Sequence, residues 1–235
     1  MVYVEDPDGP RPARTGRPRR RQIISGTQLD AEITEVLQAP ASGSNRSILD
    51  FDSPEKLAHM LSEVHLRRAV DIFVNFLRQE RANYYPLGQA IGQKTKAFLS
   101  RFFEPALLGQ VKILMLTGRR VPNPSFYSAA REMGFMNLPD LKHQAAVTFL
   151  DVVVFNEKVT ERALFHGLVH ATQVQILGVE RYAELFVRGF LKSKSYFMVP
   201  IKAHAFALDC QFAENRERGF SVETEVVRWL EQGRY

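Results

Sequence analysis

The residues best suited to carry chemistry are two histidines in the apolar segment ALFHGLVHA. His166 and His170 are four positions apart, so on an α-helix their imidazoles lie on one face, one turn apart, and can reach the same metal ion. Burying two imidazoles among apolar residues without partners is costly. The spacing and the setting together predict a metal site.

A third candidate ligand is His204, in the downstream apolar segment PIKAHAFALDCQF. Two ligands from one helix and one from the next form a common three-ligand centre with an open coordination position. Three histidines are neutral, so a bound Zn²⁺ keeps its full charge and acts as a Lewis acid on a bound water or carbonyl. We therefore expect a mononuclear zinc ion held by His166, His170 and His204. The binuclear copper alternative needs a second triad, and no two of the remaining histidines are four apart: His59, His65 and His143.

Two polar residues near these histidines are candidates for catalytic roles. Gln173 follows His170 by three residues and could orient a ligand or the substrate, or it is simply a partly exposed glutamine on the helix. Lys202 precedes His204 by two residues and could pair with a polar group of the substrate. The alternative for Lys202 is a solvated lysine at the start of a helix.

The elements that must position these residues follow from the local pattern. The run AVTFLDVVVF, residues 146–155, is rich in β-branched and aromatic residues and predicts a strand. Thr160 can cap a helix that carries the first two histidines and ends at Gly178. A further helix over residues 200–216 carries Lys202 and His204.

The other segments predict a mainly α protein of α+β type with a small sheet. Ser53-Pro54-Glu55 is typical of a helix start, and apolar residues then recur at helical spacing as far as Leu77. Residues 111–117 predict a short buried strand closed by Gly118. Further helices are predicted over residues 87–103, 126–134, 179–191 and 221–232.

The length and the charge distribution define the domain organisation. The chain has 235 residues, of which 45% are hydrophobic, as in one globular domain with an appendage. Residues 1–22 hold six arginines and three acidic residues, so they carry +3 of the net +5 and leave +2 for the other 213 residues. We therefore expect a disordered Pro/Arg-rich tail over residues 1–25, a lead-in segment over 26–52 and a single metal-binding domain over 53–235. A nuclear-targeting or nucleic-acid-contacting arm is the alternative for the tail.

Composition also limits the compartment and the kind of metal site. No apolar run approaches the length of a membrane-spanning helix, and the N-terminus lacks the order of a signal peptide. A single cysteine, Cys210, excludes an internal disulfide framework and a cysteine-rich zinc site. We expect a soluble, cytoplasmic protein without a membrane partner; the sequence makes no prediction of the oligomeric state.

Residues 146–212 resemble the catalytic core of small bacterial gluzincin-type metallopeptidase-like proteins. Their pattern is a strand followed by H-E-L-V-H-x-x-Q and, further along, P-[LI]-E-A-x-A; this chain has HGLVHATQ and PIKAHA. The resemblance implies a zincin-like helical domain, but Gly167 replaces the glutamate general base and Lys202 replaces the glutamate ligand. Without its base a peptidase cannot activate water in the usual way. Three glutamates in the unmatched half are open candidates to replace it: Glu80, Glu104 and Glu132.

The three histidines without the glutamate are similar to the zinc site of fungal hemocyanin-like cyclopenases. These proteins of quinolone alkaloid biosynthesis convert cyclopenin to viridicatin by ring contraction with C–N cleavage. The resemblance implies a zinc-dependent lyase acting on a small aromatic molecule. The other hypothesis is a catalytically degenerate metallopeptidase-like fold that serves as a binding or regulatory module. A nucleic-acid binder is the third and least favoured, because the domain itself is nearly neutral.

Overall fold

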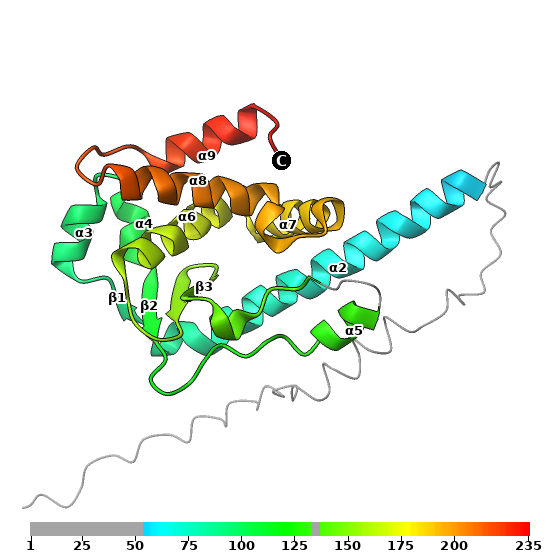
Figure 1. Cartoon of the computed structure of the whole chain (residues 1–235), viewed down its shortest axis with the longest axis horizontal. Coiled ribbons are helices and arrows are strands. Elements are labelled where there is room, and N and C mark those ends of the chain that lie inside the picture. Colours follow the sequence, from blue (N-terminus) through cyan, green and yellow to red (C-terminus); the bar gives the residue numbers. More distant parts are fainter. Residues whose placement is uncertain (1–53, 133–136) are drawn as a thin grey trace, which may run out of the picture.

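The computed structural model describes residues 54–132 and 137–235. The mainly α class with a small sheet is confirmed: long helices surround one four-stranded sheet (Figure 1). The predicted tail over 1–25 and lead-in over 26–52 lie outside the described residues. Within the described ranges, no helix has both the length and the apolar character needed to cross a lipid bilayer.

The sheet is mixed and has the strand order β1-β2-β4-β3. Its strands are β1 (Gln89–Ala90), β2 (Lys112–Met115), β3 (Ala146–Phe149) and β4 (Val152–Phe155). The central pair, β2 and β4, is parallel, and each outer strand pairs antiparallel with its neighbour. The strand predicted over 111–117 is present as the shorter β2, but it is half-buried and not buried as predicted. β3 forms one edge of the sheet.

The prediction of one strand over residues 146–155 is wrong, because this run folds back on itself. β3 and β4 form a tight hairpin that turns at Leu150 and Asp151, and Leu150 has the left-handed φ of 57°. Hairpin turns of this kind usually carry glycine or asparagine, which adopt positive φ at little cost. Leu150 and Asp151 lack this preference, so the sequence alone predicts one continuous strand.

The segment between the first helix and β2 is also more broken than predicted. Instead of one helix over 87–103, the chain forms a 3-10 turn (Tyr85–Leu87), then β1, then two short helices, α3 (Gln93–Leu99) and α4 (Pro105–Gln110). Gly88 and Gly92 flank β1, and Gly92 becomes the N-cap of α3. β1 pairs with β2 and so extends the sheet by one strand.

Helix α6 (Glu161–Leu177) is the centre of the C-terminal half and was predicted correctly at both ends. The Thr160 hydroxyl accepts a hydrogen bond from the Ala163 amide, and Gly178, with φ 76°, separates it from α7 (Val179–Ser193). Helices α8 (Pro200–Glu214) and α9 (Val222–Glu231) pack along it. α6 also packs on β3 and β4, so its histidines are set directly over the hairpin.

Helix α2 (Pro54–Tyr84) covers the other side of the hairpin. It is helical from the first described residue, Pro54, and the predicted capping Ser53 lies outside the described residues. Its C-terminal half packs on α7 and on β3 and β4, and its N-terminal half extends beyond the rest of the molecule (Figure 1). A short helix, α5 (Tyr127–Glu132), follows the loop after β2.

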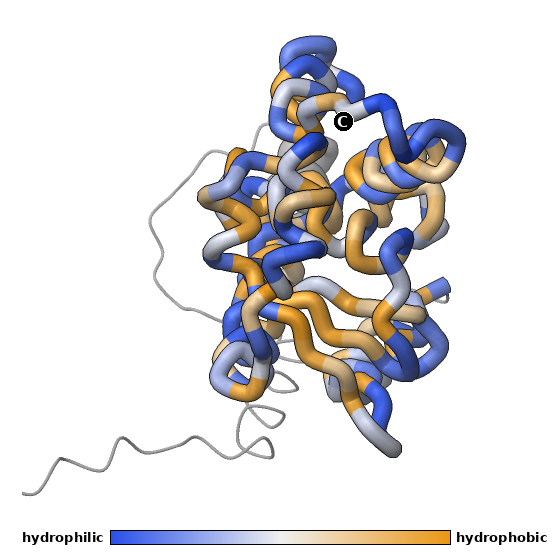
Figure 2. Tube along the Cα trace, turned by 90° about the vertical axis from the view of Figure 1, so that its left-hand side faces the viewer, coloured by the Kyte–Doolittle hydropathy of each residue, from blue (hydrophilic) through white to orange (hydrophobic). Residues whose placement is uncertain are grey.

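The core has two parts, which take up alternate residues of β4. Along β4, Val153 and Phe155 join a cluster with α6, α3, α4, α8 and α9, whereas Val152 and Val154 join a cluster with α2 and α7. This alternation is the period of two expected of a strand buried on both faces. Figure 2 shows the strands as hydrophobic stretches between the helices.

Candidate functional site

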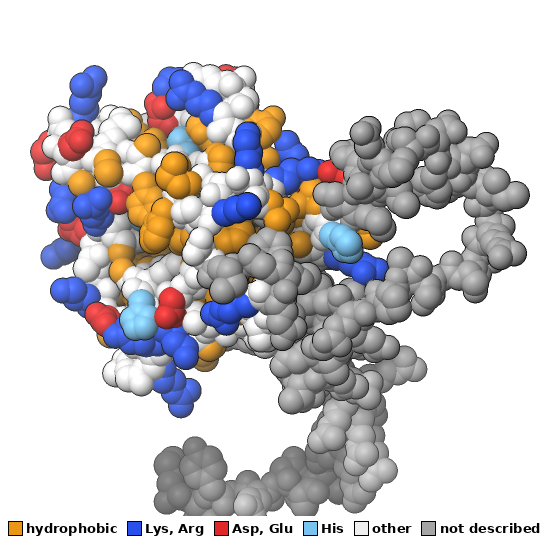
Figure 3. Space-filling view, turned by 45° about the vertical axis from the view of Figure 1, so that its right-hand side comes forward, with side chains coloured by type: hydrophobic (Ala, Val, Ile, Leu, Met, Phe, Trp, Pro, Cys, Tyr) orange, Lys and Arg blue, Asp and Glu red, His pale blue; other side chains and the backbone are white. Residues whose placement is uncertain are grey.

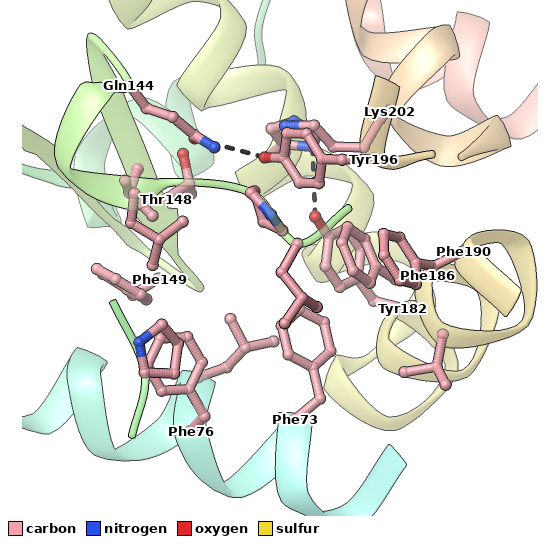
Figure 4. A pocket seen from close by; sticks show the side chains of 18 of the residues that line it. Phe73, Phe76, Gln144, Thr148, Phe149, Tyr182, Phe186, Phe190, Tyr196 and Lys202 are labelled. Atoms are coloured by element: carbon pink, nitrogen blue, oxygen red, sulfur yellow. Dashed lines mark hydrogen bonds between the residues drawn. The ribbon is translucent and has the colours of Figure 1, made fainter. Parts of the chain in front are cut away.

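A large cavity lies along the edge strand β3, between α2 on one side and α6, α7 and α8 on the other. Its volume is about 1200 Å³, and its lining is mainly apolar. Eight phenylalanines contribute to it: Phe73, Phe76, Phe126, Phe149, Phe186, Phe190, Phe197 and Phe206. Figure 4 shows Phe73 and Phe76 of α2 across the space from Gln144 and Lys202, with the rings of α7 on the side of Lys202. The cavity therefore has a polar end at α6 and α8 and an aromatic body.

His166 and His170 are brought together at the polar end, as their spacing predicted. Their rings meet edge to face with centroids 4.8 Å apart, and both residues line the cavity. Burial lowers the pKa of His166 to about 3, with the charges of Lys202 and Arg162 acting in the same direction. Burial and Lys202 also lower the pKa of His170. Both imidazoles are therefore neutral at neutral pH.

The interpretation of Lys202 as a solvated lysine is wrong. The side chain belongs to the polar end of the cavity, and the residue is only 7% exposed. Its Nζ lies 3.1 Å from Nε2 of His170, the atom that would face a metal ion. The ring of Tyr196 lies beneath the ammonium, with its centroid 4.6 Å from Nζ.

Gln173 holds His170 in place and is fully buried, not partly exposed. Its Oε1 lies 2.8 Å from Nδ1 of His170, and its Nε2 donates to the Ile201 carbonyl at 3.0 Å. Because the amide oxygen can only accept, His170 donates from Nδ1 and keeps a lone pair on Nε2. That lone pair accepts the hydrogen bond from Lys202, and the phenol of Tyr182 lies near Nδ1 at 3.4 Å.

His204 is not part of the cavity lining. Its ring stacks on Trp229 of α9, with centroids 4.8 Å apart and an interplanar angle of 6°. Burial lowers the pKa of His204 to about 4. Its Nδ1 lies 3.4 Å from Nε2 of Gln173, so the glutamine amide separates His204 from His170.

The expected zinc site does not fit this arrangement. Among the described residues, no three histidine, cysteine or acidic side chains lie close enough together to hold a metal ion. Lys202 directs an ammonium at the Nε2 of His170, and an ammonium has no lone pair to offer a metal. His166 has a buried Nδ1 without a hydrogen-bond partner. The described donor set for zinc is thus two histidines, with a cation beside them.

At Gly167, where the metallopeptidase-like pattern would have a glutamate, the structure leaves no room for a side chain. A Cβ on Gly167 would lie 2.7 Å from Cγ1 of Val153 and 3.1 Å from Oγ1 of Thr148. The Thr148 hydroxyl donates to the Gly167 carbonyl at 3.2 Å, which ties α6 to β3. The glycine therefore permits the close approach of helix and hairpin.

No described carboxylate replaces the missing base. Neither Glu80 nor Glu104 lines the cavity, and the side chain of Glu132 lies outside the described residues. The one acidic residue in the described lining is Asp209, and both its oxygens accept from Nε of Arg162 at 3.0 Å.

Several residues of the site were missed from the sequence. Tyr182, Phe186 and Phe190 follow one another at intervals of four on α7 and all line the cavity. That spacing was a usable signal, since residues four apart share a helix face. Tyr196, in the turn before α8, had no such signal; its hydroxyl hydrogen-bonds Oε1 of Gln144 at 3.4 Å.

Comparison with known proteins adds no relative. No protein-family model, no curated protein and no solved structure matches this chain.

Proposed function

We propose that this protein binds a small hydrophobic molecule in the cavity beside β3 and serves as a binding module. The observation that carries the proposal is the cavity itself, about 1200 Å³ and lined chiefly by aromatic and aliphatic side chains with a few polar groups at one end. Small-molecule sites in proteins share this composition, and their volumes are roughly 300–1000 Å³. Eight phenylalanine rings supply surfaces for stacking against a flat ligand.

The surroundings of the histidines favour binding over hydrolysis. Gly167 gives no general base, and its contact with Val153 leaves no space for one. Lys202, His170 and Gln173 form a hydrogen-bonded chain in which each group has a fixed role. Such a chain orients a buried amine toward the cavity.

The exposed surface agrees with a ligand that enters from solvent. Figure 3 shows hydrophobic side chains gathered in the middle of one face, with charged side chains around them. Phe197 lines the cavity and is still 66% exposed, so it belongs to both the cavity wall and the surface. We place the entrance beside Phe197.

The proposal is tested with the neutral fluorophore N-phenyl-1-naphthylamine and the full chain. We expect its emission to rise and saturate on titration, because the naphthyl ring moves from water into an apolar site. Ala69→Phe fills part of the cavity from α2 and should weaken binding about tenfold or more. Ala106→Phe, at an exposed position of α4 outside the lining, is the matched control and should bind as the wild type does. Equal binding by both variants would reject the cavity as the site.

The zinc-dependent, cyclopenase-like lyase stays a prediction with a separate test. Elemental analysis of protein purified without added metal should find about one zinc per chain if that function is right. His204→Ala should then abolish the zinc, and zinc-loaded protein should convert cyclopenin to viridicatin. Zinc that survives the loss of His204 would reject the three-histidine site.

A further inference from the structure

Lys202 is a buried cation without a counterion. In the described part of the chain, no carboxylate lies within ion-pairing distance of its Nζ, which hydrogen-bonds Nε2 of His170 and lies over the rings of Tyr196 and Phe206. A charge taken out of water is costly unless it is paired and hydrogen-bonded. Lys202 therefore needs an anionic partner, and the described residues provide none.

The hydrogen bond between Lys202 and His170 leaves the Lys202 ammonium able to bind an anion. An ammonium has three N–H donors, and His170 accepts one of them at Nε2. His170 cannot serve as the anion, because it is neutral and its Nδ1–H is directed at Gln173. Two donors of Lys202 therefore have no acceptor among the described residues.

The other charged groups of the lining do not supply the missing partner. Asp209 is the one acid in the described lining, and Arg162 neutralises it. His143 is at the exposed rim and pairs with Asp140. The polar end of the cavity thus keeps an excess of one positive charge, buried next to an apolar body.

We infer that the ligand is a hydrophobic monocarboxylic acid whose carboxylate accepts hydrogen bonds from Nζ of Lys202. This inference rests on the proposed function and names its ligand class. A single ammonium matches a single negative charge, whereas a phosphate of higher charge would need more donors than this end offers. The hydrophobic body of the acid lies against the phenylalanines of α2, across the cavity from Lys202, with those of α7 beside it (Figure 4).

Three naphthalene compounds that differ in the head group test the inference by isothermal titration calorimetry. They are 1-naphthylacetate, 2-(1-naphthyl)ethanol and 2-(1-naphthyl)ethylamine, with one shared body and an anionic, neutral or cationic head. We expect the carboxylate to bind about ten- to a hundredfold more tightly than the alcohol, as a charge-assisted hydrogen bond provides. The amine should bind weakest, because its charge repels Lys202.

Variants at Lys202 test whether this side chain causes the preference for the carboxylate. Lys202→Met keeps the length and loses the charge, so the carboxylate and the alcohol should bind it equally. Lys202→Arg should retain a preference for the carboxylate. The control is Lys192→Met, which removes an exposed lysine of α7 outside the lining and should leave all three affinities unchanged.

The outcomes separate this inference from the proposed function. Equal binding of carboxylate and alcohol to the wild-type protein overturns the inference and leaves the binding function standing. A carboxylate preference that survives in a folded Lys202→Met protein also overturns it. If none of the three compounds binds and N-phenyl-1-naphthylamine also fails, the binding function itself is wrong and the inference falls with it.

Discussion

At Gly167 the distance between helix α6 and the hairpin is set by a missing side chain. A Cβ there would come within 2.7 Å of Val153, a fully buried residue of β4. Valine is stiff at χ1, so its methyl groups cannot turn away without moving the strand or the helix. The glycine thus determines how closely α6, with both cavity histidines, approaches the sheet.

We therefore predict that Gly167→Ala lowers the free energy of unfolding by about 1–3 kcal/mol, the usual cost of overpacking a core. Gly109→Ala is the control, because Gly109 is also helical, and a Cβ there meets nothing within 4 Å. The control should be neutral or stabilising, since alanine is the better helix former. Urea unfolding monitored by circular dichroism measures the free energy of unfolding of both variants.

A second substitution tests whether the contact with Val153 is the cause of this destabilisation. Val153→Ala removes the methyl groups that a new Cβ would meet, so the double variant should be less destabilised than the sum of the two single variants. Additive effects in that cycle would show that the contact with Val153 is not what excludes a side chain at position 167.

The positions of Lys202 and His204 show what the sequence could decide at this scale. Residues two apart on a helix point in directions about 200° apart, so both could not face the cavity. Helix geometry therefore predicts that only one of Lys202 and His204 faces the cavity, but it does not predict which one. The answer depends on how α8 packs against α6 and α7, which brings Lys202 to His170 and leaves His204 to stack on Trp229.

At the scale of elements, the tight hairpin is tied to helix α2 by one ion pair. Nε and Nη2 of Arg81 donate to the two carboxylate oxygens of Asp151 at 2.6 and 2.8 Å. Asp151 is in the turn between β3 and β4, next to Leu150 with its positive φ. The pair therefore ties α2 to the hairpin, and both of these elements also contribute residues to the cavity lining.

We predict a coupling energy of about 1 kcal/mol between Arg81 and Asp151, because the pair is bidentate but about a third exposed. It is measured by a double-mutant cycle with Arg81→Gln and Asp151→Asn in urea unfolding. Arg216 and Glu161, a more exposed pair at 2.8 Å, provide the control cycle and should couple less. Equal coupling in the two cycles would contradict the role given to Arg81.

Helices with local start and stop signals were predictable, and elements fixed by distant partners were not. α6 has its capping Thr160 and terminal Gly178 in the sequence, and both act as predicted. The hairpin had no turn residues to mark it, and β1 exists because a distant strand pairs with it. In these two segments tertiary pairing overrides the local pattern.

At the scale of the whole molecule, the cavity is assembled from segments that are far apart in the chain. α2 forms one wall and β3 an edge, and α6 to α8 line the cavity together with residues of the segments 124–130 and 138–145. The sequence alone located the histidine pair, because it depends on one helix. It could not locate the cavity, because the phenylalanines of α2 and α7 meet only after both helices pack on the hairpin.

The stacking of His204 on Trp229 has a consequence for observing the protein in solution. Trp229 is the single tryptophan of the chain, and Gln173 lies between His204 and the cavity residue His170. A carboxylate bound to Lys202 places a negative charge beside His170, at the start of the contacts that run through Gln173 and His204 to the indole. We expect decanoate, which does not fluoresce, to change the tryptophan emission on titration, and Gln173→Leu to suppress the change while decanoate still binds by calorimetry. An unchanged emission at saturating decanoate would disprove the coupling; otherwise the protein contains its own optical reporter of an occupied cavity.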